Sequence, residues 1–148
     1  NFRMTDIQAA VGREQLRRLP GMLALRRDQV DRYRKLLADI PGLHCPEPPS
    51  WARSNWQSFC VRLPEGVDQR RAMESMLAAG VSTRRGVMCA HREPAYAKEP
   101  WIGSDLRESE RAQDRGLILP LHHGLTVAHL ERVAEALRKA CNPKALKR

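Results

Sequence analysis

Apolar side chains recur every three or four residues near the start of the chain, the spacing of one face of an α-helix. The clearest case is residues 22–40, whose apolar positions are Met22, Leu25, Val30, Tyr33, Leu36, Leu37 and Ile40. Residues 5–19 repeat more loosely behind a Thr-x-x-Gln capping box that opens at Thr5. Because Pro20 and Gly21 separate the two segments, we expect two antiparallel helices joined by a short turn.

From residue 41 onward, the pattern predicts short strands between helices. Residues 41–55 are rich in proline and predict an irregular connector, whereas the alternation in 56–63 predicts a strand. Residues 69–79 have helical spacing between Asp68 as a cap and Gly80 as a stop, with the inward positions expected to be Met73, Met76 and Leu77. A second short strand is predicted over 81–83.

The rest of the chain is predicted to hold a long loop over 86–104, a helix over 105–115 and a strand over 116–120. Thr126 caps a last helix with an apolar face formed by Val127, Leu130, Val133, Ala134, Leu137 and Cys141. This order predicts an α+β fold, with a small antiparallel or mixed sheet of three to four short strands and helices packed on one face. We expect an N-terminal helical pair over 1–40 and a small α/β domain over 41–148.

The chain of 148 residues is basic, with 26 Lys and Arg against 17 Asp and Glu and a net charge of +9. This balance favours anionic partners, whether nucleic acid, phosphorylated small molecules or an acidic protein surface, although solvated helix faces account for many such charges. No apolar stretch approaches the ~20 residues of a membrane span, and no leader segment opens the chain. We therefore expect a cytoplasmic protein without a membrane partner.

Motifs of a self-contained active site are absent from the sequence, which has no G-x-S-x-G, G-x-x-x-x-G-K-[ST] or G-x-G-x-x-G pattern. The four cysteines are far apart and match no paired-ligand spacing, so we expect reduced thiols and no metal site. Paired carboxylates placed for acid–base chemistry are also missing. Catalysis by this chain alone is therefore not predicted.

Binding residues are suggested at two places. The predicted loop carries His91, Glu93, Tyr96 and Lys98 within eight residues. Asn1 and Arg3 stand just ahead of a helix N-terminus, a position where free backbone N–H groups and the helix dipole favour a phosphate. Of the remaining histidines, His122 and His123 fall in a loop, whereas His44 and His129 are expected at the surface or in packing positions.

Four sequence runs resemble motifs of the DegT/DnrJ/EryC1/StrS family of sugar aminotransferases. The run NFRMTDIQAAVG at residues 1–12, followed by QL, is similar to the family segment N-[YF]-R-M-[TS]-[DE]-x-Q-A-A-[LIV]-G-x-x-Q-L. GVST at 80–83 resembles G-[IV]-x-T, and HREPAY at 91–96 resembles H-x-x-P-A-Y. SERA at 109–112 with LILPLH at 117–122 matches the remaining pattern, so the resemblance covers nearly the whole chain.

The resemblance implies a C-terminal portion of the aspartate-aminotransferase fold, type I, which uses pyridoxal phosphate. The family's Schiff-base lysine lies upstream of the first motif and none of the five lysines matches it, so no catalytic residue is assigned here. Asn1 matches an asparagine that reaches the cofactor phosphate of the neighbouring subunit. Among substrate-binding residues, Arg3 is implied beside it, and His91 and Tyr96 line the sugar-nucleotide pocket. Less specifically, Arg84 and Arg85 are expected to attract a nucleotide diphosphate.

The intact enzyme implied by this resemblance transfers an amino group, usually from glutamate, to a keto-sugar carried on a nucleotide. It would work as a cytoplasmic homodimer with composite sites. Two alternatives within the family stay open, a sugar dehydratase and a cyclitol aminotransferase, because the upstream lysine position decides between them. The alternative from another class is a basic helical module that binds nucleic acid, which the arginines favour and the lack of a base-stacking motif opposes.

Overall fold

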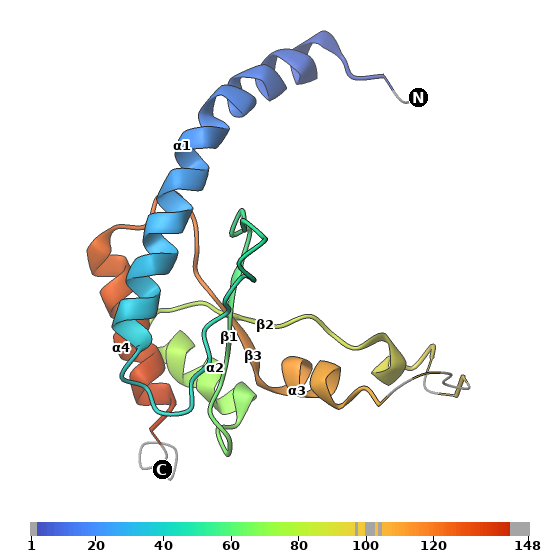
Figure 1. The fold of residues 1–148 in the computed structure, drawn as a ribbon, viewed down its shortest axis with the longest axis vertical. Helices are drawn as coiled ribbons and strands as arrows, with labels where there is room; N and C mark the ends of the chain where they lie inside the picture. Colours follow the sequence, from blue (N-terminus) through green and yellow to red (C-terminus); the bar gives the residue numbers. More distant parts are fainter. Residues whose placement is uncertain (1–2, 97, 100–102, 104, 143–148) are drawn as a thin grey trace.

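A three-stranded antiparallel sheet lies at the centre of the computed structural model, which describes residues 3–96, 98, 99, 103 and 105–142 (Figure 1). Chain order gives α1 (Asp6–Leu37), β1 (Phe59–Arg62), α2 (Gln69–Ala78), β2 (Arg84–Arg85), the 3₁₀ turn η1 (Ala90–Arg92), α3 (Arg107–Arg115), β3 (Gly116–Leu119) and α4 (Val127–Ala140). The strand order is β1-β3-β2, so the last strand in sequence is central. The α+β class and the small antiparallel sheet expected from the sequence are confirmed.

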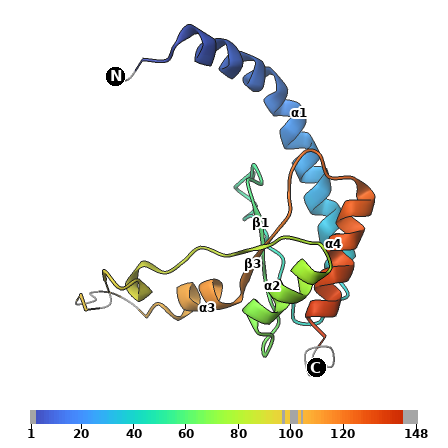
Figure 2. The ribbon, with the colours of Figure 1, turned by 180° about the vertical axis from the view of Figure 1, so that it is seen from behind.

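The hydrophobic core joins this sheet to three helices. Phe59 pairs with Leu119 and Val61 with Leu117 across β1 and β3, and all four side chains are buried. Because side chains alternate along a strand, these residues share one face of the sheet. The same core receives side chains from α1, α2 and α4, including Val30, Tyr33, Leu37, Ala72, Met76, Leu130, Val133 and Leu137. Figure 2 shows α4 lying beside α1 and α2.

The expected pair of N-terminal helices is wrong, because α1 is one helix of 32 residues that runs through Pro20. A proline inside a helix removes one backbone hydrogen bond and crowds the carbonyl one turn earlier, which costs about 3 kcal/mol. Pro20 is exposed, so water can bond that carbonyl, and Gly21 next to it has no crowding neighbour. The stability of the helical segments on both sides of Pro20 therefore exceeds the cost of the proline, and the helix continues. Figure 1 shows that α1 is curved.

Two predicted strands differ from those observed. The strand expected over 56–63 is confined to β1, because Trp56 has a φ of 50°, which interrupts the extended conformation. The strand expected over 81–83 lies instead at β2. Val81 belongs to the end of α2, since its N–H donates to the Met76 carbonyl at 2.9 Å while Gly80 adopts a φ of +76°. This is a Schellman stop, which only a glycine adopts without strain.

The helix caps agree with the sequence better than the helix faces do. Asp68 caps α2 by accepting the Arg71 N–H at 2.7 Å, and Thr126 forms a capping box with His129 at the start of α4. Leu77 and Val127, however, are 64% and 47% exposed, although both were expected to point inward. In the part of the chain that the structure describes, no helix has the length and apolar character that crossing a membrane requires.

The Pro20→Ala variant tests the account of α1. Restoring the backbone hydrogen bond and removing the ring clash is expected to raise the free energy of unfolding by up to about 3 kcal/mol. Urea unfolding followed by circular dichroism measures it. Arg18→Ala, an exposed change in the same helix, should alter stability by no more than about 0.5 kcal/mol. Equal or lower stability of Pro20→Ala would show that α1 does not continue through residue 20.

Candidate functional site

The start of α1 carries the first predicted binding residues. Asn1 lies outside the described residues, and Arg3 is exposed just ahead of the helix. Thr5 and Gln8 form the predicted capping box, in which the Gln8 N–H reaches Thr5 Oγ1 at 3.3 Å and the Thr5 N–H reaches Gln8 Oε1 at 2.9 Å. With Asp6 adding a negative charge in the first turn, the helix terminus itself is partly satisfied. The predicted phosphate contact would therefore depend on the residues ahead of the helix.

The N-terminal half of α1 exposes apolar side chains. Ile7, Val11 and Leu16 are 79%, 57% and 68% exposed, and Met4 and Leu19 are exposed as well. Ile7 and Val11 are one helical turn apart, whereas Leu16 is on a different side of the helix. A helix segment that is apolar on more than one side is usually buried on more than one side. This half of α1 therefore has the character of a contact surface.

His91 lies in an arm that projects from the sheet, formed by η1, the turn at residues 93–96 and α3 (Figure 1). His91 Nε2 lies 3.0 Å from Glu110 Oε1, Arg92 Nη1 donates to Asp114 Oδ1 at 2.6 Å, and Arg92 Nη2 lies 3.4 Å from Glu110 Oε2, so three contacts of these side chains tie η1 to α3. The hydrogen bonds from His91 and then Arg92 hold the pKa of Glu110 below its ordinary value. His91 thus fixes the shape of the arm as well as being a candidate ligand contact.

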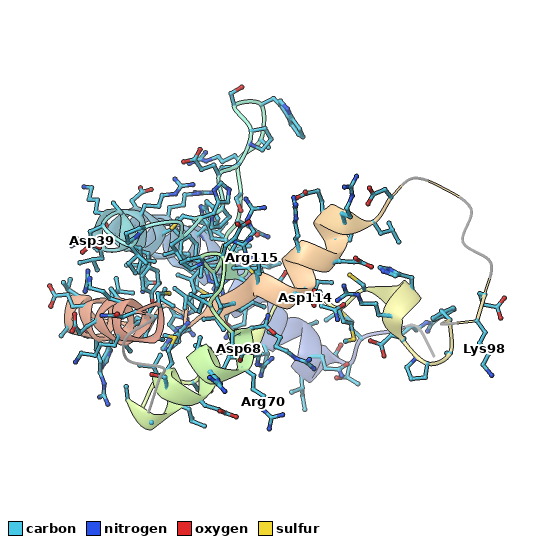
Figure 3. All side chains as sticks on the ribbon, turned by 90° about the horizontal axis from the view of Figure 1, so that it is seen from below. Asp39, Asp68, Arg70, Lys98, Asp114 and Arg115 are labelled. Atoms are coloured by element: carbon cyan, nitrogen blue, oxygen red, sulfur yellow. The ribbon has the colours of Figure 1, made fainter. Side chains whose placement is uncertain are left out.

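The outer part of the arm exposes the other predicted contact. Tyr96 is 58% exposed in a turn beyond η1. Figure 3 places Lys98 at the outer end of the arm and Asp114 close to η1. The start of α1 and the arm extend to the same side of the sheet but do not meet (Figures 1 and 2). Within this chain, the predicted residues Arg3, His91 and Tyr96 therefore do not form one site.

Arg84 and Arg85 occupy the edge strand β2, and both are exposed. Successive side chains of a strand point to opposite faces, and accordingly the two arginines border different hollows. Arg85 faces a small hollow beside α2 together with Met73 and Leu77, whereas Arg84 faces a larger cleft. The two side chains therefore do not act as one clamp on a diphosphate.

The larger cleft lies between the end of β3, the segment leading into β2 and the start of α4, and we call it the β3–α4 cleft. Its volume is about 940 Å³. The polar side chains around it include Arg84, Arg132, His122, His129, Gln57 and Ser58. Of the predicted site residues that the structure describes, only Arg84 borders it.

Most residues of the β3–α4 cleft were not predicted from the sequence. His122 was indicated by its loop position, whereas His129 was expected to be a surface or packing residue. Arg132 carried no signal at all, because arginines are common along the chain. Arg132 is held at the cleft by a long-range hydrogen bond, because its Nη2 donates to the carbonyl of Ala79, 53 positions earlier in the sequence, at 2.8 Å.

Metal binding finds no support in the geometry, since no three His, Cys, Asp or Glu side chains gather within residues 3–96 and 105–142. The four cysteines are free. Cys141 is buried, which raises its pKa to about 11 and leaves the thiol protonated.

Comparison with known proteins gives one consistent result. The sequence model of the DegT/DnrJ/EryC1/StrS aminotransferase family matches residues 1–138. The dTDP-4-dehydro-2,3,6-trideoxy-D-glucose 4-aminotransferase of Saccharopolyspora spinosa is 34% identical, over 91% of this chain and 34% of its own length. The GDP-perosamine synthase of Caulobacter vibrioides is 36% identical, over 93% of this chain and 37% of its own.

The fold agrees with a solved structure. DesV of S. venezuelae, crystallised in complex with a ketimine intermediate, superposes with a TM-score of 0.82 at 28% identity. The match covers 95% of this chain and 37% of DesV. The chain thus spans about a third of the length of the proteins that it matches.

The contact between His91 and Glu110 predicts a measurable shift. The pKa of Glu110, ordinarily 4.5, is lowered in the folded chain, so its stabilising contribution is complete above pH 4.5 and is lost as the pH falls through the lowered value. The hydrogen bond from His91 is the largest cause of this lowered pKa. The variant His91→Gln should therefore raise the Glu110 pKa toward 4.5, which a carboxyl NMR titration measures. His44→Gln is the control and should leave it unchanged. An unchanged Glu110 pKa in His91→Gln would contradict the contact.

Proposed function

The chain belongs to the DegT/DnrJ/EryC1/StrS aminotransferase family, and from this we propose that it is the C-terminal part of a pyridoxal-phosphate-dependent aminotransferase acting on a nucleotide-linked keto-sugar. The observation that carries the proposal is the family match over residues 1–138. The two relatives described above are named for products or substrates linked to dTDP and GDP, which supports a nucleotide-sugar substrate. An amino acid, usually glutamate in this family, is the proposed donor.

The cofactor would have to be held largely by parts of the protein outside this chain. Pyridoxal phosphate supplies the electron sink and carries the amino group when it is bound. None of the lysines in the sequence matches the family's Schiff-base position, and Asn1 is the proposed contact to the phosphate. The structure fits this role to the extent that the exposed Arg3 adds positive charge ahead of α1, while the capped helix terminus leaves the phosphate to these two residues.

The substrate-facing role of this chain is assigned to the arm. We propose that the His91 ring and the Tyr96 hydroxyl contact the sugar nucleotide and shape its pocket, without moving protons in the reaction. The exposed Tyr96 is available for such a contact, and the bonds from η1 to α3 hold the arm in one shape before substrate binds. Pre-formed contacts of this kind reduce the ordering cost of binding.

The exposed apolar half of α1 supports a composite site. Residues 1–40 are proposed to link this small domain, residues 41–148, to the larger cofactor-binding domain. Burying Ile7, Val11 and Leu16 against that domain and a second subunit would remove apolar surface on more than one side of α1. The active protein is therefore proposed to be a homodimer in which each subunit gives Asn1 to its partner's cofactor. A cytoplasmic location stays a prediction.

Cofactor uptake is the first test. The intact protein should gain the visible absorbance of bound pyridoxal phosphate and convert a nucleotide keto-sugar to the amino sugar with glutamate as donor. Residues 1–148 alone should do neither, because the Schiff-base lysine is not among them. An intact protein that takes up no cofactor and leaves both substrates unchanged would overturn the proposal.

Mixed dimers test the shared site. Asn1→Asp places a negative charge against the cofactor phosphate and is expected to weaken cofactor affinity at least about tenfold. When this variant is mixed with one that lacks the Schiff-base lysine, one site of each hybrid dimer regains both native residues. At limiting cofactor, the mixture should therefore be more active than either variant alone. If mixing gives no gain although hybrids form, Asn1 acts within its own subunit or not at all.

A further inference from the structure

Two guanidinium groups at the β3–α4 cleft have no carboxylate partner within the described part of the chain. Arg132 donates to the Ala79 carbonyl at 2.8 Å, which holds the group at the cleft wall. The structure gives no side-chain hydrogen bond or ion pair to Arg84 among the described residues. Elsewhere the arginines commonly pair with acids, as Arg92 does with Asp114 and Arg138 with Asp39. Arg84 and Arg132 thus present unneutralised positive charge.

Two imidazoles at the same cleft are set to donate hydrogen bonds. His122 Nδ1 accepts the Gly124 N–H at 3.2 Å, and His129 Nδ1 accepts the Thr126 N–H at 3.2 Å. A neutral imidazole with one nitrogen accepting carries its proton on the other nitrogen, so both rings have an Nε2–H. Within the described residues neither Nε2–H has a protein acceptor.

The other residues that line the β3–α4 cleft add no negative charge. None of the described residues around the cleft is acidic, and the neutral polar ones are Gln57, Ser58, Ser82 and Thr83. The hydroxyl of Thr83 is buried without a hydrogen-bond partner in the described structure. A buried polar atom of this kind is costly unless something binds it. Hydrogen-bond donors and positive charges that line a cleft of about 940 Å³ favour an anionic ligand.

We propose that the β3–α4 cleft is a phosphate-binding site for a diphosphate group. Guanidinium groups bind phosphate oxygens through paired, charge-assisted hydrogen bonds, and a diphosphate offers enough oxygens for Arg84, Arg132 and the two imidazoles. The volume also accommodates the nucleoside that such a group often carries. Diphosphate binding at the β3–α4 cleft does not itself depend on the proposed transamination.

Gly80 leaves the space that the Arg132 guanidinium occupies at the wall of the β3–α4 cleft. A methyl group at this position would lie 2.5 Å from Arg132 Nη2, and the φ of +76° disfavours any other residue. The Schellman stop that ends α2 therefore also makes room for the guanidinium. This arrangement joins α2 to α4 and fixes Arg132 before any ligand arrives.

The test is calorimetric titration of the intact protein with inorganic pyrophosphate. Native protein should bind it, and Arg84→Gln and Arg132→Gln should each weaken binding by about tenfold, the effect of losing one charge-assisted contact. Arg71→Gln is the matched control, because Arg71 is an exposed arginine of α2 outside the cleft, and it should change binding less than about twofold. Since Arg84 is exposed on an edge strand, its variant decides the question if Arg132→Gln fails to fold.

Competition identifies the source of the diphosphate. Displacement of pyrophosphate by the nucleotide-sugar substrate supports the site as the anchor of the substrate's diphosphate, and simultaneous binding supports it as the site of a separate ligand. If pyrophosphate does not bind, or binds equally to native protein and both variants, the proposal is wrong. Cofactor uptake by the same samples reports on the transaminase separately, so either proposal can fail without the other.

Discussion

The anchoring of α1 on the sheet is the contact on which the other features depend. Tyr33 stacks on Phe59 of β1, with ring centroids 5.4 Å apart, and its hydroxyl donates to the Pro120 carbonyl at 2.8 Å. One turn earlier, the Gln29 amide donates to the His122 carbonyl at 2.9 Å. The Tyr33 hydroxyl and the Gln29 amide nitrogen are both buried and hydrogen-bonded, which makes one orientation of the helix more stable than others. The same bonds fix residues 120–125, which lead from β3 into α4.

The contacts of Tyr33 and Gln29 position both the N-terminal extension of α1 and the wall of the β3–α4 cleft. Toward the N-terminus, α1 continues as a curved extension with exposed Ile7, Val11 and Leu16, and Arg3 lies just ahead of it. Toward the sheet, the fixed segment carries His122 into the wall of the β3–α4 cleft. One ordered core therefore positions both the extension, which we propose completes a site elsewhere in the intact enzyme, and the cationic β3–α4 cleft.

The sequence predicted best what depends on neighbouring residues. Asp68, Gly80 and Thr126 act on backbone groups two to four positions away, so the ends of α2 and the start of α4 were predictable. Pro20 was misjudged because the outcome depends on 32 residues of helix rather than on the proline alone. The cleft was not predicted because Arg132 and Arg84, which are 48 positions apart in sequence, line the same cleft only through the tertiary fold, which no sequence spacing encodes. The family resemblance, carried by four motifs, predicted the functional class that the residues alone left open.

The most direct test is a crystal structure of the intact protein with pyridoxal phosphate and a nucleotide sugar. Our account predicts the Asn1 amide within hydrogen-bonding distance of the phosphate of the cofactor in the neighbouring subunit, with the arm from His91 to Tyr96 against the sugar nucleotide. A structure in which Asn1 points away from every cofactor, while the arm contacts no ligand, would contradict it.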